Sequence, residues 1–157
     1  MLATLDPATT ANAVDVGCGS GILAIAMAKL WRRPVLGGDN DEQAVEVAKE
    51  NADLNGVGQL CHFVHSVGLG APELAAQAPY DLIVANILAG PLTELSDAFA
   101  AAVGAGGRVL LSGLLVEQAG HLLSVYARRG FAFERRVDRE THGAWWRTLL
   151  LRRSRQS

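Results

Sequence analysis

One stretch near the start of the chain, Val14-Asp15-Val16-Gly17-Cys18-Gly19-Ser20-Gly21, constrains the fold more than any other. The apolar residues before it and the apolar run over 22–28 predict a buried strand, a glycine-rich turn and a helix. This unit opens nucleotide-binding α/β sheets. A dinucleotide fingerprint would need glycine where Ile22 stands, and the Gly-Lys-Ser/Thr of a P-loop is missing. The alternative is a tight turn that simply needs small residues.

Composition limits the class of protein and its partners. A chain of 157 residues suits one domain with a sizeable core, and 50% hydrophobic with 19% charged residues predicts a soluble globular protein. The net charge of −2 implies no strong attraction to nucleic acid, so direct nucleic-acid binding is not expected. Cys18 and Cys61 lack metal-ligand spacing and fit reduced thiols in a cytoplasmic protein. Neither a membrane-spanning run nor a signal peptide is expected.

Apolar strand patterns alternate with helical patterns along the whole chain. Each strand pattern is followed by a helix or a turn. The helix over 20–30 is apolar nearly all round, which predicts deep burial. Two further runs, 131–137 and 145–151, predict a terminal antiparallel hairpin in which one of Trp145 and Trp146 packs on the core. The other expected strands cover 13–16, 35–38, 60–65, 80–85 and 108–112; the other expected helices cover 41–55, 91–103 and 116–129, with a turn at 104–107.

Asp39 follows the second expected strand and lies 22 residues after Gly17. An acidic residue about 20 residues past such a turn accepts hydrogen bonds from ribose hydroxyls, and a carboxylate can accept two in parallel. The alternative is a helix cap, but Asn40, with Gln43 three residues on, matches a capping box, and Asp41 could also cap. We therefore predict that Asp39 binds ribose.

Four segments together resemble one family. The D-x-G-x-G-x-G pattern resembles the first motif of S-adenosylmethionine-dependent methyltransferases, whose cofactor carries no phosphate. Segments 15–30, 37–57, 85–95 ("ANILAGPLTEL") and 106–118 are similar to those of the PrmA family, the ribosomal protein L11 methyltransferases. This resemblance implies a Rossmann-like, seven-stranded α/β sheet with a C-terminal antiparallel hairpin. It also implies methyl transfer from S-adenosyl-L-methionine to amino groups of a ribosomal protein.

The resemblance also implies roles for particular residues. The first-motif glycines would line the methionine moiety, Asp39 would hold the ribose, and Asn86 would be the catalytic residue beside the methyl donor. Adenine would lie where the third strand ends at Ser66; many methyltransferases have Asp there, and this chain does not. The predicted cofactor site comprises Asp15, Gly17, Cys18, Gly19, Gly21, Asp39, Asn40, Ser66 and Asn86.

Two departures from the family pattern qualify the expected activity. The family's N-terminal recognition domain and linker, and its Gly-Thr-Gly-x-His-x-Thr-Thr segment, have no counterpart here, so residues 1–157 are expected to form only the catalytic domain. The alternatives are another amino methyltransferase and a non-catalytic cofactor-binding fragment. Against a nucleobase or amide methyltransferase, Asn86 is followed by Ile87-Leu88-Ala89 and not by Pro-Pro-Tyr/Phe.

Overall fold

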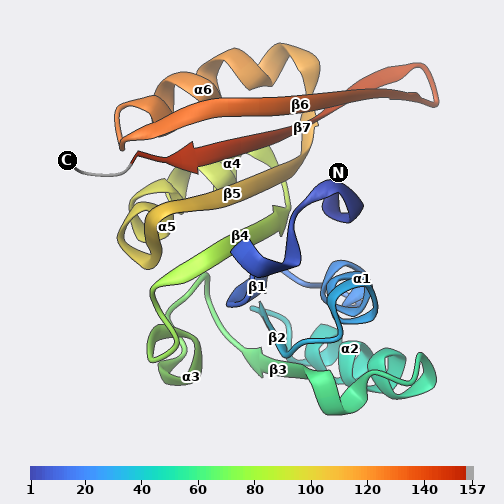
Figure 1. Cartoon of the computed structure of the whole chain (residues 1–157). Helices are drawn as coiled ribbons and strands as arrows, with labels where there is room; N and C mark the ends of the chain where they lie inside the picture. The colour runs from blue at the N-terminus through green and yellow to red at the C-terminus, as the bar shows by residue number, and fades with distance from the viewer. Residues whose placement is uncertain (155–157) are drawn as a thin grey trace.

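A computed structural model of the chain describes residues 1–154 and is built around one seven-stranded sheet with the strand order β3-β2-β1-β4-β5-β7-β6 (Figure 1). The first five strands run parallel, whereas β7 pairs antiparallel with both β5 and β6. The predicted sheet and terminal hairpin are therefore confirmed, with β7 inserted inside the sheet and β6 at its edge. The strands are β1 (Ala13–Val16), β2 (Val35–Asp39), β3 (Cys61–His65), β4 (Tyr80–Asn86), β5 (Val103–Leu115), β6 (Phe131–Thr141) and β7 (Ala144–Arg153).

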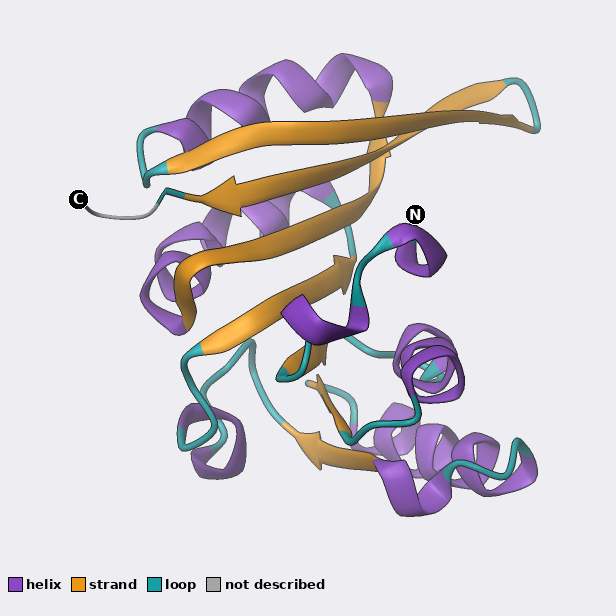
Figure 2. Cartoon of the chain, viewed as in Figure 1, coloured by secondary structure: helices purple, strands orange, loops and turns teal. Residues whose placement is uncertain are grey.

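Helices cover both faces of this sheet and divide the core into two layers (Figure 2). α1 and α2 pack on one face against residues such as Leu82, Val84 and Leu110, while the later helices pack on the other against Ile83 and Leu111. Alternate residues of β4 thus serve opposite layers, as the period of two in a strand requires. The helices are α1 (Ile22–Trp31), α2 (Glu42–Leu54), α3 (Pro72–Ala75), α4 (Ala89–Glu94), α5 (Ser96–Ala102) and α6 (Ala119–Ala127).

Several helix predictions need correction. The helix expected over 91–103 is two helices, because the chain bends at Leu95 between α4 and α5. The helix expected over 116–129 begins as a 3₁₀ turn, η4 (Val116–Gln118), before α6. α1 is less buried than predicted: Ile22, at its first position, is 68% exposed and Leu30, near its end, is 49% exposed. The short 3₁₀ turn η3 (Gly58–Leu60) leads into β3.

The antiparallel part of the sheet also differs from the prediction. The expected turn at 104–107 lies inside β5, which begins at Val103 because that residue pairs with Tyr80 of β4; the next pair is Arg108 with Leu82, so residues 104–107 form an irregularity in the strand. The two hairpin strands are longer than the apolar runs, and their distal part projects beyond the rest of the sheet (Figure 1). Trp145 and Trp146 are both exposed there, at 57% and 39%, because no helix covers that part of the hairpin. The prediction that one of them packs on the core is wrong.

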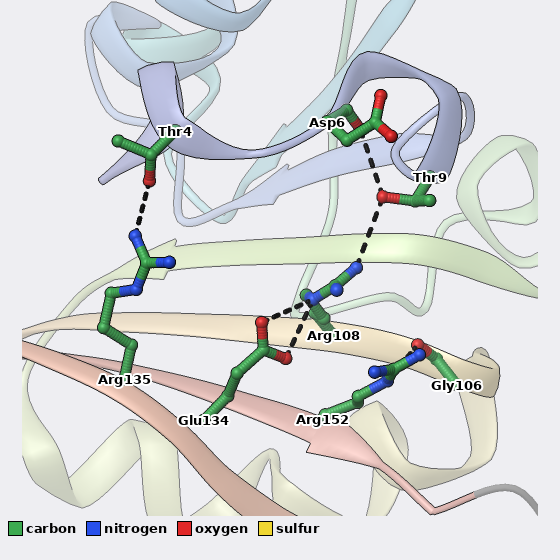
Figure 3. A network of polar contacts seen from close by, with 8 residues as sticks. All are labelled: Thr4, Asp6, Thr9, Gly106, Arg108, Glu134, Arg135 and Arg152. Atoms are coloured by element: carbon green, nitrogen blue, oxygen red, sulfur yellow. Dashed lines mark hydrogen bonds and ion pairs between the residues drawn. The ribbon is translucent and has the colours of Figure 1, made fainter.

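The N-terminal segment is tied to the antiparallel strands by side chains (Figure 3). It forms two 3₁₀ turns, η1 (Leu2–Thr4) and η2 (Pro7–Thr9). Arg135 of β6 donates to the Thr4 hydroxyl at 2.8 Å, and Arg108 of β5 pairs with Glu134 at 2.9 Å while also reaching Thr9. Exposed ion pairs of this kind contribute little stability individually, so the network mainly fixes where this segment lies.

Candidate functional site

The glycine-rich loop lies at the carboxyl ends of β1 and β2, where the parallel strands of such sheets bind ligands. The backbone N–H groups of Gly17 and Cys18 both donate to the Gly38 carbonyl, so β1 continues to pair with β2 into the loop. Gly17, Gly19 and Gly21 all have positive φ, which side chains other than that of glycine rarely adopt. Three left-handed residues in five turn the chain sharply from β1 into α1.

Asp15 lies beneath this loop and is only 1% exposed. One carboxylate oxygen, Oδ2, accepts the Ala24 N–H at 3.1 Å, which caps α1 because its N-cap residue, Gly21, has no side chain. The other, Oδ1, is buried and has no hydrogen-bond partner among the described residues. Burial, with a smaller contribution from the charge of Asp39, raises the pKa of Asp15 to about 7. A buried acceptor without a hydrogen-bond partner destabilises the folded state. Such an atom therefore indicates a place where a ligand can supply the missing hydrogen bond.

Asp39 is the second carboxylate at the loop. Its Oδ2 accepts the Gly19 N–H at 2.7 Å and its Oδ1 accepts the Asp41 N–H at 3.0 Å. The predicted capping box of Asn40 and Gln43 is wrong: the cap of α2 is Asp41, whose side chain accepts the Gln43 N–H. Asp39 therefore does not cap α2, and its bond to the Gly19 N–H restrains the glycine-rich loop. Each of its oxygens keeps a further lone pair that can accept a hydrogen bond from a ligand.

Cys18 lies within the loop and is buried. Burial and the nearby carboxylates of Asp15 and Asp39 raise the pKa of its thiol to about 12. The thiol therefore stays protonated at neutral pH, which rules out a thiolate nucleophile at this position. Cys18 can contribute its backbone and its small volume to the site, but no charge.

Two cavities meet at Gly17. The first, here called the loop cavity, has a volume of about 190 Å³ and brings together predicted residues from β1, the loop and the end of β4. The second, the apolar cavity, has a volume of about 480 Å³ and shares Gly17 with the first. The loop cavity is lined by Asp15, Gly17, Cys18, Gly19, Ser20, Ile22, Leu23 and Asn86. The apolar cavity is lined by Val16, Gly17, Asn40, Ser66, Val67, Gly68, Ile87, Leu88, Pro91, Glu94 and Leu95.

Not every predicted residue faces these cavities. Gly21 lines neither of them; a Cβ there would meet Ala48 and Phe63 at 3.0 Å, so its missing side chain lets α1 approach α2 and β3. Ser66 lines the apolar cavity, but its hydroxyl already donates to the Gly68 carbonyl and accepts the Ala71 N–H. Ser66 therefore shapes the loop after β3 and has little left to offer a ligand.

Sequence reasoning missed the apolar wall of the second cavity. That wall comes largely from the segment after β4, including Ile87, Leu88 and Pro91, with Val67 from the loop after β3. Ile87 also contacts the loop, because a Cβ on Gly17 would lie 2.5 Å from its Cγ2 atom. The sequence did contain a signal: three apolar residues, Ile87, Leu88 and Ala89, directly follow a parallel strand at the edge of the sheet where ligands bind.

Asn86 is the last residue of β4 and is exposed, and its amide makes no hydrogen bond within residues 1–154. It lines the loop cavity together with Asp15, although 71 positions separate the two residues in the chain. Ser112 of β5 pairs with Asn86, and its hydroxyl shares a hydrogen bond of 3.0 Å with the Thr148 hydroxyl of β7. The loop cavity thus combines the buried carboxyl group of Asp15 with the Asn86 amide, which can accept or donate a hydrogen bond.

A family model described as "Ribosomal protein L11 methyltransferase (PrmA)" matches residues 2–153. The chain is 47% identical over 140 residues to a ribosomal protein L11 methyltransferase of Rhodopseudomonas palustris; the match covers 89% of this chain and 46% of that protein. The chain thus spans about half the length of the curated relatives it matches.

Solved structures agree with this match. A ribosomal protein L11 methylase from Lactobacillus delbrueckii subsp. bulgaricus superposes with a TM-score of 0.78 at 32% identity, covering 90% of this chain and 69% of the other. The M1A22 tRNA methyltransferase of B. subtilis superposes with a TM-score of 0.79 at 16% identity, over 98% of this chain and 64% of the other, and shares the fold alone. The fold is thus that of the class I methyltransferases. With the family match over nearly the whole length and the glycine loop, the chain belongs to the PrmA family of ribosomal protein L11 methyltransferases.

Proposed function

We propose that this chain binds S-adenosyl-L-methionine across the loop cavity and the apolar cavity and is the catalytic domain of an enzyme that methylates amino groups of ribosomal protein L11. The observation that carries the proposal is the buried, unpaired Oδ1 of Asp15 in a cavity that adjoins a larger apolar one. An enzyme that methylates a ribosomal protein acts in the cytoplasm. Within residues 1–154, no helix is long and apolar enough to span a membrane.

The chemistry of the two cavities fits this cofactor. Asp39, together with the partly ionised Asp15, makes the loop negative, which favours a ligand with a cationic amino-acid end and disfavours the pyrophosphate of a dinucleotide. Asp39 can accept the ribose hydroxyls with the lone pairs that its bonds to Gly19 and Asp41 leave free. The apolar cavity, with Asn40 at its border, suits the flat adenine ring, held by packing because Ser66 is already bonded.

Asn86 is proposed to orient the acceptor amine. When bound, S-adenosylmethionine supplies a methyl group on an excellent leaving group, so the protein chiefly positions the donor and the acceptor. A lysine amine has a pKa near ~10.4 and must lose a proton before it reacts. The Asn86 carbonyl oxygen can accept a hydrogen from the neutral amine and aim its lone pair, since that amide has no competing bond among the described residues.

Calorimetry tests the cofactor. We expect S-adenosylmethionine and its demethylated product to bind the isolated chain, whereas NAD and ATP produce no heat of binding. Binding of NAD in preference to S-adenosylmethionine would overturn the proposal.

A transfer assay with labelled cofactor and purified ribosomal protein L11 tests the activity. Remote binding energy positions the reacting atoms, so we expect slow transfer by the isolated chain. Joining it to the unmatched half of the R. palustris relative should raise the rate, and Asn86→Ala in that fusion should lower it with little loss of cofactor affinity. Cofactor binding without transfer in the fusion would favour a non-catalytic binding module.

A further inference from the structure

A one-residue irregularity in β5 lies directly beside Asn86. Leu111 pairs with Leu149 of β7, but the next pair is Leu114 with Arg147. Three steps along β5 therefore match two steps along β7, which is the signature of a β-bulge at residues 112–113. Gly113, with φ +80°, adopts the left-handed conformation that lets the strand make this bulge.

The bulge brings the backbone of β5 against the end of β4. A Cβ on Gly113 would lie 2.7 Å from the Ile87 carbonyl oxygen and 3.0 Å from Oδ1 of Asn86. A glycine is therefore needed for the close approach itself as well as for the turn. Next to it, the Ser112 hydroxyl and the Thr148 hydroxyl share a hydrogen bond of 3.0 Å that joins the bulge to β7.

The contact with Gly113 bears on the orientation of the Asn86 side-chain amide. The Asn86 side chain is exposed and makes no hydrogen bond within residues 1–154, so only packing restricts its rotation. Productive transfer needs reacting groups held to within a fraction of an ångström. We propose that the β5 bulge, formed by Gly113 and the Ser112–Thr148 pair, is a positioning element that orients the Asn86 amide. The proposal deepens the function of Asn86 and rests on it.

The test uses two left-handed glycines with the same strain. Gly113→Ala adds a methyl group against Asn86 and Ile87, whereas Gly130→Ala, at φ +81°, adds one with nothing within 4 Å. Both should lower the melting temperature, since alanine is strained at such φ values. At 16.6 kDa the chain suits NMR, and the Asn86 side-chain amide signals are identified by their loss in Asn86→Ala. We expect these signals to move in Gly113→Ala and to stay in place in Gly130→Ala.

A second pair of variants covers the case in which Gly113→Ala does not fold. Thr148→Val keeps the shape of the side chain but removes the hydroxyl, while Thr148→Ser keeps the hydroxyl. We expect Thr148→Val to move or broaden the Asn86 amide signals and Thr148→Ser to preserve them, with cofactor affinity within about twofold of the original in both. Asn86 signals that are identical in Gly113→Ala and Gly130→Ala, or in the two Thr148 variants, would overturn the positioning role. Loss of cofactor binding by the unaltered chain would instead count against the proposed function.

Discussion

The two halves of the sheet treat their carboxylates in opposite ways. In the parallel half, Asp15 is buried with one oxygen unpaired, and burial raises its pKa to about 7. In the antiparallel half, Asp138 of β6 accepts two hydrogen bonds from Arg147 of β7, at 2.6 and 2.7 Å, which lower its pKa. In the hairpin the Asp138 carboxylate is paired with a side chain of the adjacent strand, whereas in the parallel half one carboxyl oxygen of Asp15 has no hydrogen-bond partner among the described residues.

The difference follows from how each half is connected. An antiparallel pair sets side chains opposite one another, so a residue such as Asp138 finds a partner on the next strand. Parallel strands send their carboxyl ends into separate loops at one edge, where a polar group such as Asp15 has no side chain on a neighbouring strand set opposite it. Unmet hydrogen-bonding capacity therefore marks the candidate site, and paired charge marks the scaffold. Four substitutions test this contrast.

The largest effect is expected from Gly19→Val. The position lies on the loop cavity and a Cβ there meets nothing within 4 Å, so the added side chain would fill space that we assign to the cofactor. Calorimetry should show S-adenosylmethionine binding weakened by more than about 100-fold, on the order of 3 kcal/mol. Gly56→Val is the matched control, because Gly56 also has positive φ and open surroundings but lies at the end of α2. Equal affinity in the two variants would contradict the assignment.

Asp15→Asn should raise stability and lower affinity. Between about pH 4 and pH 7 the folded carboxyl keeps a proton that the unfolded one releases, so the stability of the unaltered protein falls as the pH rises through this range. Asparagine carries no such charge and can still accept the Ala24 N–H. In urea denaturation without ligand, the variant should be more stable near pH 8, by on the order of 4 kcal/mol at most, with no advantage below about pH 4. A difference in unfolding free energy that stays constant across this pH range would show that burial does not raise the pKa of Asp15.

Asp39→Ala should weaken cofactor binding by about 1–3 kcal/mol, the usual cost of losing charge-assisted hydrogen bonds. Because Asp39 also accepts from Gly19 and Asp41, we expect a modest loss of stability as well. Asp41→Ala separates the two effects: it removes the cap of α2 and should cost about 1 kcal/mol of stability without changing affinity. Melting curves and calorimetry on both variants measure this, and a similar affinity in the two would make Asp39 purely structural.

The smallest effect is expected from Asp138→Asn. Its ion pair with Arg147 stabilises the hairpin above the ordinary pKa of aspartate, and this contribution is lost as the pH falls through the lowered pKa of the folded state. The variant should therefore melt slightly below the unaltered protein near pH 7, and the difference should shrink as the pH falls below the ordinary pKa of aspartate. Cofactor affinity should not change. If affinity falls instead, the hairpin takes part in the site and the contrast between the two halves fails.

The strand, glycine turn and helix at 13–31, and the positions of Asp39 and Asn86 at strand ends, were readable because they depend on near neighbours in the sequence. Periodicity and turn residues are local, so they indicate where elements lie and which ends carry polar groups. The bend at Leu95 and the start of β5 at Val103 were not predicted, because both depend on tertiary contacts.

The sequence by itself determined the sheet's parallel core, its terminal hairpin and the set of polar residues at one edge. Only the tertiary structure decided which of those residues meet. It placed Asn86 in one cavity with Asp15, left one Asp15 oxygen unpaired, committed the Ser66 hydroxyl to its own loop and set the β5 bulge against Asn86. The physical reason is that desolvation and register depend on groups far apart in the chain, which no local pattern of residues records.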